Sequence, residues 1–277
     1  MKSDETEKEY ALTPKEVYTM ITGATGGLGE AFVRIAAKNG ENLILTGRYE
    51  GKLRLLKEKI LAEHTGIDVR IYAADLSDEA SRASMMRAIA EAHLKIARLI
   101  NVAGADIQKP FSDYTQEKIS FQCRVNFEAA AALCRFALEV RAKELEIINI
   151  SSVSGLYPMP YFAIYSALKG ALTNFSVALS REMKGTGVSV TAVLPGAVYT
   201  RPDVVEYIKK QGIWGKIAAK SPQFVAKHSL AAVDKGKVKY IPGVANKLMR
   251  AFTALIPMRL KLRFIAKKWS KTRKDAF

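Results

Sequence analysis

The fold of this 277-residue chain is decided by Val17-Tyr-Thr-Met-Ile-Thr-Gly-Ala-Thr-Gly-Gly-Leu-Gly29. The stretch opens with an apolar run typical of a buried strand, and the glycines follow at once. A helical pattern comes next and ends at Asn39-Gly40, a normal C-terminal signal. Strand, glycine-rich turn and helix in this order indicate nucleotide binding, because glycines admit a pyrophosphate close to the backbone and the helix N-terminus offers it free N–H groups. An ordinary tight turn is the alternative.

The rest of the chain alternates strand and helix patterns. Further strands are expected over 42–46, 69–73, 98–101, 147–150, 188–194 and 238–241. Helices are expected between them, including a long one over 115–140. About seven strands alternating with helices predict a parallel, doubly wound sheet in a single α/β domain. Residues 201–222 show little pattern, and we expect a lid or substrate loop there.

The end of the second expected strand carries Arg48. In this kind of fold an acid at that place binds the ribose 2′-OH, whereas a base accommodates a 2′-phosphate. Arg48 therefore predicts NADP(H) as cofactor, with a solvated arginine as the alternative. After the third strand, Asp75 is a candidate acceptor for an adenine amino group, and Ser77 or Asp78 is expected to cap the following helix.

Candidate catalytic residues lie around Tyr165 and Lys169, which are four residues apart and so share one face of a helix. An ammonium group beside a phenol favours the phenolate, so we expect Lys169 to lower the pKa of Tyr165. Ser152 follows the strand over 147–150, where its hydroxyl can hydrogen-bond a substrate oxygen. Asn126 lies between Val125 and Phe127 on the long helix and is expected to be partly buried with partners. A surface tyrosine and a solvated lysine are the alternative.

Composition, the start of the chain and the cysteine and histidine positions predict the cellular location of the protein and whether it binds a metal. With 49% hydrophobic residues the chain can bury a substantial core, and it has no apolar run of the ~18 residues that a membrane span needs. The charged start shows no signal peptide, and Cys123 and Cys134 are too far apart on one helix to bridge, so we expect a cytoplasmic protein. Three scattered histidines give no ligand spacing, and no metal site is expected.

Together these motifs resemble the short-chain dehydrogenase/reductase superfamily over residues 15–242. Its glycine motif is matched by Thr22-Gly23-x-x-x-Gly27-x-Gly29, and its segment at the nicotinamide end by Pro195-Gly196-x-x-x-Thr200. Its catalytic Ser, Tyr, Lys and Asn are matched by Ser152, Tyr165, Lys169 and Asn126. One departure is visible: the family's Asn-Asn-Ala-Gly reads Asn101-Val102-Ala103-Gly104 here.

The resemblance implies a Rossmann-type fold and an NADP(H)-dependent carbonyl reductase or alcohol dehydrogenase, in a branch with steroid- and ketoacyl-reductase-like members. Tyr165 would be the general acid/base, Lys169 would bond the nicotinamide ribose, Ser152 would orient the carbonyl oxygen, and Asn126 would hold a relay water. A homodimer or homotetramer is also implied. The expected cofactor residues are Thr22, Gly23, Thr25, Gly27, Leu28, Gly29, Arg48, Asp75, Leu76, Asn101, Ala103, Gly104, Tyr165, Lys169, Pro195, Gly196, Val198 and Thr200. An apolar small-molecule carbonyl or alcohol substrate is expected from Leu156, Tyr157, Met159, Val198, Tyr199 and Trp214.

The C-terminal end is a basic, amphipathic helical extension over 244–277, after a polar arm over 1–14 and the catalytic domain over 15–243. The whole chain has a net charge of +16, and this extension contains ten Lys/Arg and a single acid. Either it packs on the domain or across a dimer interface, or it lies peripherally on an anionic membrane. Nucleic acid is not expected as a partner. A non-catalytic, NADP-binding scaffold or regulator at a membrane is the alternative function.

Overall fold

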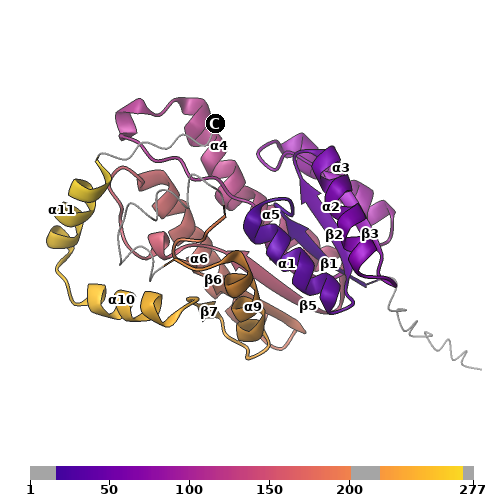
Figure 1. Cartoon of the computed structure of the whole chain (residues 1–277). Coiled ribbons are helices and arrows are strands. Elements are labelled where there is room, and N and C mark those ends of the chain that lie inside the picture. Colours follow the sequence, from indigo (N-terminus) through magenta and orange to yellow (C-terminus); the bar gives the residue numbers. More distant parts are fainter. Residues whose placement is uncertain (1–16, 201–218, 271–277) are drawn as a thin grey trace, which may run out of the picture.

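The computed structural model describes residues 17–200 and 219–270 (Figure 1). The expected polar arm over 1–14 and most of the expected lid over 201–222 lie outside these residues. The expected substrate-lining residue Trp214 lies outside them too.

The centre of the molecule is a seven-stranded parallel sheet in the order β3-β2-β1-β4-β5-β6-β7. The strands are β1 Val17–Thr22, β2 Asn42–Gly47, β3 Val69–Ala73, β4 Lys95–Asn101, β5 Arg141–Ile150, β6 Val188–Val193 and β7 Lys239–Tyr240. The order reverses between β1 and β4. In open parallel sheets, this is where a ligand crevice forms beyond the carboxyl ends of the strands. The predicted doubly wound α/β fold is confirmed.

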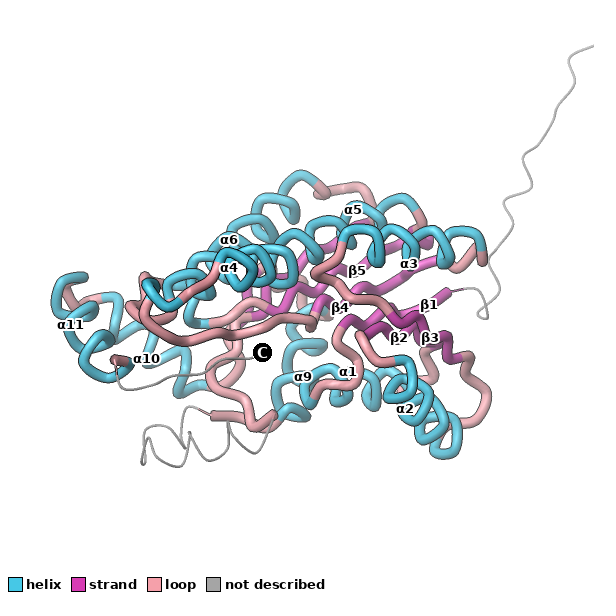
Figure 2. Tube along the Cα trace, turned by 90° about the horizontal axis from the view of Figure 1, so that it is seen from above, coloured by secondary structure: helices cyan, strands magenta, loops and turns pink. Residues whose placement is uncertain are grey.

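Helices cover both faces of the sheet, as Figure 2 shows from above. On one face lie α1 Gly27–Lys38, α2 Glu50–Glu63 and α9 Pro222–Val233. On the other lie α3 Glu79–Glu91, α4 Gln116–Cys123, α5 Ala129–Glu139 and α6 Ala163–Glu182. Each face has its own apolar core, since a parallel sheet covered on both sides buries nearly continuous hydrophobic strands. These cores hold the carboxyl edge of the sheet in a fixed geometry.

Two strands and one helix differ clearly from the sequence predictions. The strands β4 and β5 begin earlier than expected, at Lys95 and Arg141. The expected helix over 115–140 is not continuous, because a π-helical turn over Arg124–Glu128 separates α4 from α5. Such turns insert an extra residue and are frequent at functional sites. Here the turn contains the buried Asn126.

The C-terminal extension forms two helices, α10 Val244–Ala254 and α11 Met258–Trp269. Both contact the domain that the preceding residues form. Asn246 of α10 is buried, and its side chain lies against Gly196. Ile265 of α11 is buried in a small cluster with Met159 and Phe162. Among the described residues, no helix has both the length and the apolarity that a membrane span requires.

Candidate active site

The three predicted catalytic side chains meet at the carboxyl end of β5. Ser152 lies two residues after this strand and hydrogen-bonds Tyr165, which lies in the first turn of α6. Lys169, one turn further on, donates from Nζ to the backbone oxygen of Ile150 at 2.9 Å, and its Nζ lies 5.6 Å from the Tyr165 ring centroid. A hydroxyl, a phenol and an amine are thus held together at one edge of the sheet.

A close glycine contact fixes this arrangement. The short 3-10 helix η4, Val153–Leu156, lies against α6. A Cβ built on Gly155 would lie only 2.5 Å from the backbone nitrogen of Gly170. No larger residue fits at Gly155 without moving one of the two helices. Ser152 caps η4, since its hydroxyl accepts from the backbone N–H of Ser154 at 3.1 Å, so this packing also places the serine hydroxyl.

Asn126 reaches the same site from the π-helical turn. Its amide brackets Ala105, with Nδ2 donating to the Ala105 oxygen at 2.8 Å and Oδ1 accepting from the Ala105 N–H at 3.2 Å. The neighbouring Gly104 separates it from the lysine. A Cβ on Gly104 would lie 3.0 Å from Asn126 Oδ1 and 3.2 Å from Lys169 Nζ. The structure therefore brings Asn126 close to the other three residues.

Burial controls the ionisation of this site. The pKa of Tyr165 is raised, first by burial and then by the negative charge of Asp106, while its hydrogen bond with Ser152 acts in the opposite sense. The pKa of Lys169 is lowered by burial to about 8, although Asp106 acts to raise it. The Tyr165 pKa is therefore raised, against the expected lowering by Lys169, because desolvation of the phenolate has the largest influence on it.

The glycine turn after β1 closes tightly on the end of β4. Gly23 has a φ of +60°, and a Cβ there would lie 3.1 Å from Ala103 Cα. The hydroxyl of Thr22 accepts hydrogen bonds from the backbone N–H groups of Val102 and Ala103, at 2.9 and 3.0 Å. Because Thr22 at the end of β1 makes these hydrogen bonds, the backbone at Val102 and Ala103 is held in place. Val102 occupies the position where the resembling superfamily has its second asparagine.

The other expected cofactor residues of the first half lie around this turn. Arg48 is exposed just after β2, and its guanidinium lies 5.6 Å from the Tyr49 ring centroid. The carboxylate of Asp75 accepts from the hydroxyl of Ser77 at 2.7 Å, while Asp78 caps α3, as expected. Leu28 in the first turn of α1 and Leu76 beside Asp75 are both buried, and Thr25 is half-buried.

The remaining expected cofactor residues are Asn101 and those in the segment after β6, and they have other surroundings. Asn101 is buried in the sheet and donates to Asn149 Oδ1 at 2.8 Å, which strengthens the β4–β5 pair. Pro195 accepts from the Val153 N–H at 3.0 Å, which links this segment to the catalytic serine. Thr200 lies next to the glycine turn, because a Cβ on Gly27 would lie 2.9 Å from its backbone oxygen. Val198 forms a bridge with Lys220.

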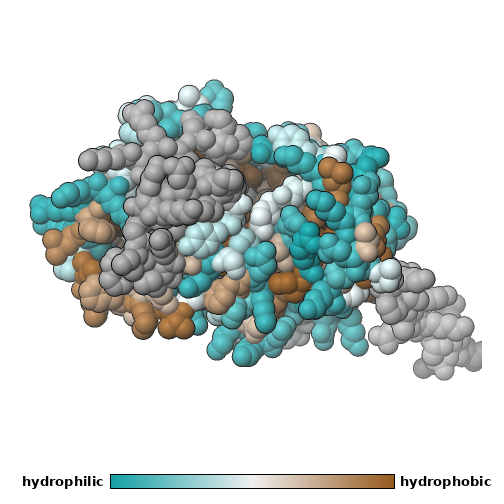
Figure 3. All heavy atoms as spheres, in the orientation of Figure 1, coloured by the Kyte–Doolittle hydropathy of each residue, from teal (hydrophilic) through white to brown (hydrophobic). Residues whose placement is uncertain are grey.

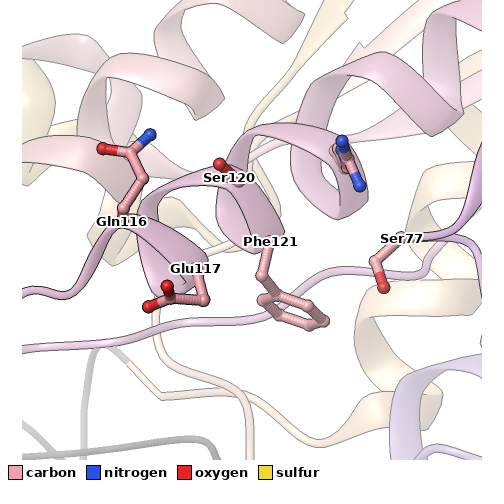
Figure 4. A pocket seen from close by; sticks show the side chains of 6 residues that line it. Ser77, Gln116, Glu117, Ser120 and Phe121 are labelled. Atoms are coloured by element: carbon pink, nitrogen blue, oxygen red, sulfur yellow. The ribbon is translucent and has the colours of Figure 1, made fainter.

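A pocket of about 310 Å³ lies beside the expected adenine end (Figure 4). Its lining is mostly from α4, with Phe121 projecting between Glu117 and Ser77 in this view. Ser77 connects it to the segment that follows β3. None of the predicted catalytic residues lines this pocket.

Two residues of the site were missed from the sequence. Phe162 stacks on Tyr165, the predicted general acid/base, with ring centroids 4.4 Å apart. It follows Leu156, Tyr157 and Met159, which the sequence predicts to line the substrate pocket, and this was a weak signal for its place in the site. Asp106 is half-buried, and its charge acts on both Tyr165 and Lys169. Nothing in its sequence neighbourhood indicated this, because the loop over 104–109 reaches the site only through the fold.

The residues present fit a bound dinucleotide. The glycine turn leaves exposed backbone at Gly26 and Gly27 at the start of α1, and an arginine stands beyond β2. A glycine turn of this kind at the strand-order reversal of the sheet, together with a buried Tyr–Lys–Ser set, defines a class, the oxidoreductases that interconvert carbonyl and alcohol groups on a Rossmann-type fold.

Comparison with known proteins gives the family. Residues 18–210 match the short chain dehydrogenase family, and the chain belongs to it. A 2,3-dihydroxy-2,3-dihydro-p-cumate dehydrogenase of Pseudomonas putida is 29% identical over 82% of this chain and 83% of its own. A very-long-chain 3-oxoacyl-CoA reductase of Bos taurus is 30% identical over 78% of this chain and 68% of its own.

Solved structures agree with the family assignment. A 7beta-hydroxysteroid dehydrogenase has a TM-score of 0.79 and 25% identity, covering 91% of this chain and 98% of that one. A short-chain dehydrogenase from Sphingobium yanoikuyae in complex with NADPH has a TM-score of 0.72 and 26% identity, covering 87% of this chain and 96% of that one.

Proposed function

We propose that the protein is an NADP(H)-dependent reductase of a lipophilic ketone or aldehyde, or the corresponding alcohol dehydrogenase. The observation that carries the proposal is the convergence of Tyr165, Lys169 and Ser152 at the carboxyl end of β5, beside the glycine turn. A buried phenol, amine and hydroxyl in mutual contact have no use in a protein that only binds the cofactor, and this speaks against a non-catalytic scaffold.

Each residue has a distinct task in reduction. Bound NADPH would supply a hydride to the carbonyl carbon. Ser152 donates a hydrogen bond that orients the carbonyl oxygen, and Tyr165 transfers its proton to that oxygen as the alcohol forms. Because burial raises its pKa, Tyr165 keeps this proton at neutral pH. Lys169 stabilises the phenolate left behind and returns a proton to it, with Asn126 and a water as the relay to solvent.

The choice of NADP(H) rests on Arg48. It is exposed at the carboxyl end of β2, where a 2′-phosphate would lie, and no acid occupies that place. A relative with similar structure binds NADPH. A guanidinium makes bidentate, charge-assisted hydrogen bonds to phosphate, which favours the phosphorylated cofactor.

The proposal of an apolar substrate rests on the residues that surround the catalytic tyrosine. Met159 and Phe162 are buried next to it, with Tyr157 and Trp269 packed against them. Relatives with similar sequence or structure include a very-long-chain 3-oxoacyl-CoA reductase and a hydroxysteroid dehydrogenase. Both names describe largely hydrocarbon substrates, which fits such a wall. Assembly as a homodimer or homotetramer stays a prediction.

The proposal is tested by Tyr165→Phe, with Tyr49→Phe as a matched control at an exposed tyrosine. NADPH oxidation is followed with a panel of long-chain ketones, aldehydes and 3-keto lipids. Tyr165→Phe is expected to lose at least about 10²-fold in kcat, the range of a positioned general acid, and to bind NADPH as the unaltered protein does. Retained turnover in Tyr165→Phe would refute the mechanism. Full NADPH binding without turnover of any carbonyl by the unaltered protein would favour the scaffold.

A further inference from the structure

The C-terminal helices α10 and α11 present an apolar surface that nothing in the described structure covers. On α10, Val244, Leu248 and Phe252 recur every four residues and so share one face, with Leu255 one turn further on. All four are exposed, Leu255 by 85%. On α11, Leu260 and Phe264 are four apart and exposed too. Figure 3 shows this apolar area over the two helices. We call these six residues the apolar face.

The two helices that carry the apolar face are rich in cations and contain no acid. Residues 244–269 contain seven Lys/Arg and no Asp or Glu. Six of the seven cations are exposed, among them Arg263 and Lys267, which flank Phe264 on α11. Helices with apolar side chains on one side and Lys/Arg beside them bind in the interface of anionic bilayers, where the chains enter the acyl boundary and the cations meet the headgroups.

A second copy of the chain fits this surface poorly. A twofold contact brings the same patch of both copies together, so seven cations would face seven cations across the interface. An acidic soluble partner would satisfy the charges but not the six exposed apolar side chains. An anionic lipid surface satisfies both features.

The opposite side of α11 faces the catalytic site. Ile265 is buried against Met159 and Phe162. The Trp269 ring stacks on Phe162 with centroids 6.1 Å apart, and Phe162 stacks on Tyr165 at 4.4 Å. The α11 helix therefore carries its part of the apolar face, Leu260 and Phe264, on one side and the wall of the catalytic site on the other. The rings of Trp269 and Phe162 thus connect the backbone of α11 to the Tyr165 phenol.

We propose that the apolar face of α10 and α11 docks the enzyme on an anionic lipid bilayer, which delivers a membrane-dissolved carbonyl substrate past Trp269 to Tyr165. The substrate half of this statement rests on the function proposed above. The docking half stands on the helices alone.

Vesicle co-sedimentation tests the docking. The full-length protein is mixed with phosphatidylcholine vesicles, with or without phosphatidylserine, and is expected to pellet mainly with the anionic ones. Phe252→Ser combined with Phe264→Ser should lose most of the bound fraction, and because both rings are 69% exposed, their removal takes little packing from the fold. Phe111→Ser is the matched control, because this phenylalanine is 64% exposed on another part of the surface.

A second pair of variants tests the charges. Arg263→Glu with Lys267→Glu should weaken binding to anionic vesicles by at least about 25-fold, at about fivefold for each cation removed from an anionic surface. Lys59→Glu with Lys235→Glu has the same net charge change on exposed residues outside the extension and should weaken it far less. Equal pelleting of all variants, or equal pelleting on neutral and anionic vesicles, would overturn the proposal. A dimer that Phe252→Ser/Phe264→Ser dissociates would assign the apolar face to a second copy.

Catalysis and docking are separated by Tyr165→Phe. This variant should pellet with anionic vesicles as the unaltered protein does, even though it cannot turn over, so a failure of the proposed reaction would leave the docking result intact. Delivery is then read from two substrates. Anionic vesicles should raise the rate with a vesicle-borne long-chain ketone and leave the rate with a water-soluble ketone unchanged. Equal rates for the long-chain ketone with and without vesicles would overturn delivery.

Discussion

Gly155→Ala is the sharpest perturbation that the structure offers. The new Cβ would lie 2.5 Å from the Gly170 nitrogen and 2.6 Å from the Lys169 carbonyl carbon. The shorter distance is about 0.9 Å below the 3.4 Å at which ordinary contact begins, and both neighbours are backbone atoms that no rotamer change can move. η4 must therefore move away from α6 by about that amount. Because Ser152 caps η4, its hydroxyl moves with it, away from Tyr165.

Two magnitudes follow. Overpacking of a tight contact costs about 1–3 kcal/mol in the free energy of unfolding. A misplacement of about 1 Å in a catalytic group can cost about 10²-fold in rate. We expect Gly155→Ala to unfold at lower urea concentration and to lose about 10²-fold in kcat. Its NADPH affinity should change little, since the glycine turn at Gly23 lies elsewhere.

Gly51→Ala is the control for this substitution. Gly51 lies in the first turn of α2, where a Cβ would meet nothing within 4 Å. Its replacement should stabilise the protein by up to about 1 kcal/mol and leave turnover unchanged. Urea unfolding and steady-state NADPH oxidation measure both effects. If Gly155→Ala changes the free energy of unfolding by less than about 0.5 kcal/mol and kcat by less than about twofold, the glycine contact does not position the serine.

Arg48→Glu should raise the KM for NADPH by about 10- to 100-fold, the worth of a charged hydrogen bond, and leave the KM for NADH nearly unchanged; equal effects on both would mean that another residue reads the phosphate. Ser152→Ala should lower kcat by about 10²–10³-fold at unchanged NADPH affinity, and a smaller loss would make the serine structural. Reduction should decline above about pH 8, because it needs protonated Lys169, whose pKa burial lowers to about 8. Asp106 raises that pKa, so Asp106→Asn should move the decline to lower pH, and an unchanged pH profile of kcat would contradict the role of Asp106.

Hydrophobic periodicity predicted the strands and helices well where the residues of a single segment are enough to fix its conformation. The apolar runs at Ile21 and Ile148 are strands because a parallel sheet buries both of their faces, and the helices between them follow from chain connectivity. The prediction of one continuous helix over 115–140 was wrong around Asn126. A π-helical turn is an arrangement of backbone hydrogen bonds stabilised by contacts with the distant Ala105, and no local pattern reports it.

The candidate site shows the same division. Spacing alone put Tyr165 and Lys169 on one helix face and Ser152 at a strand end. The direction of the Tyr165 pKa shift was predicted wrongly, because burial and the charge of Asp106 come from segments that only the folded chain brings near.

What the sequence determined by itself is the order of strands and helices, the glycine turn and the identity of the chemical groups, since periodicity, turn residues and side-chain chemistry are local properties. Only the tertiary structure decided how these groups ionise and what encloses them. Desolvation depends on every segment packed around a side chain, and the position of α11, with Trp269 behind Phe162 and Phe264 facing outward, follows from contacts between residues about a hundred positions apart.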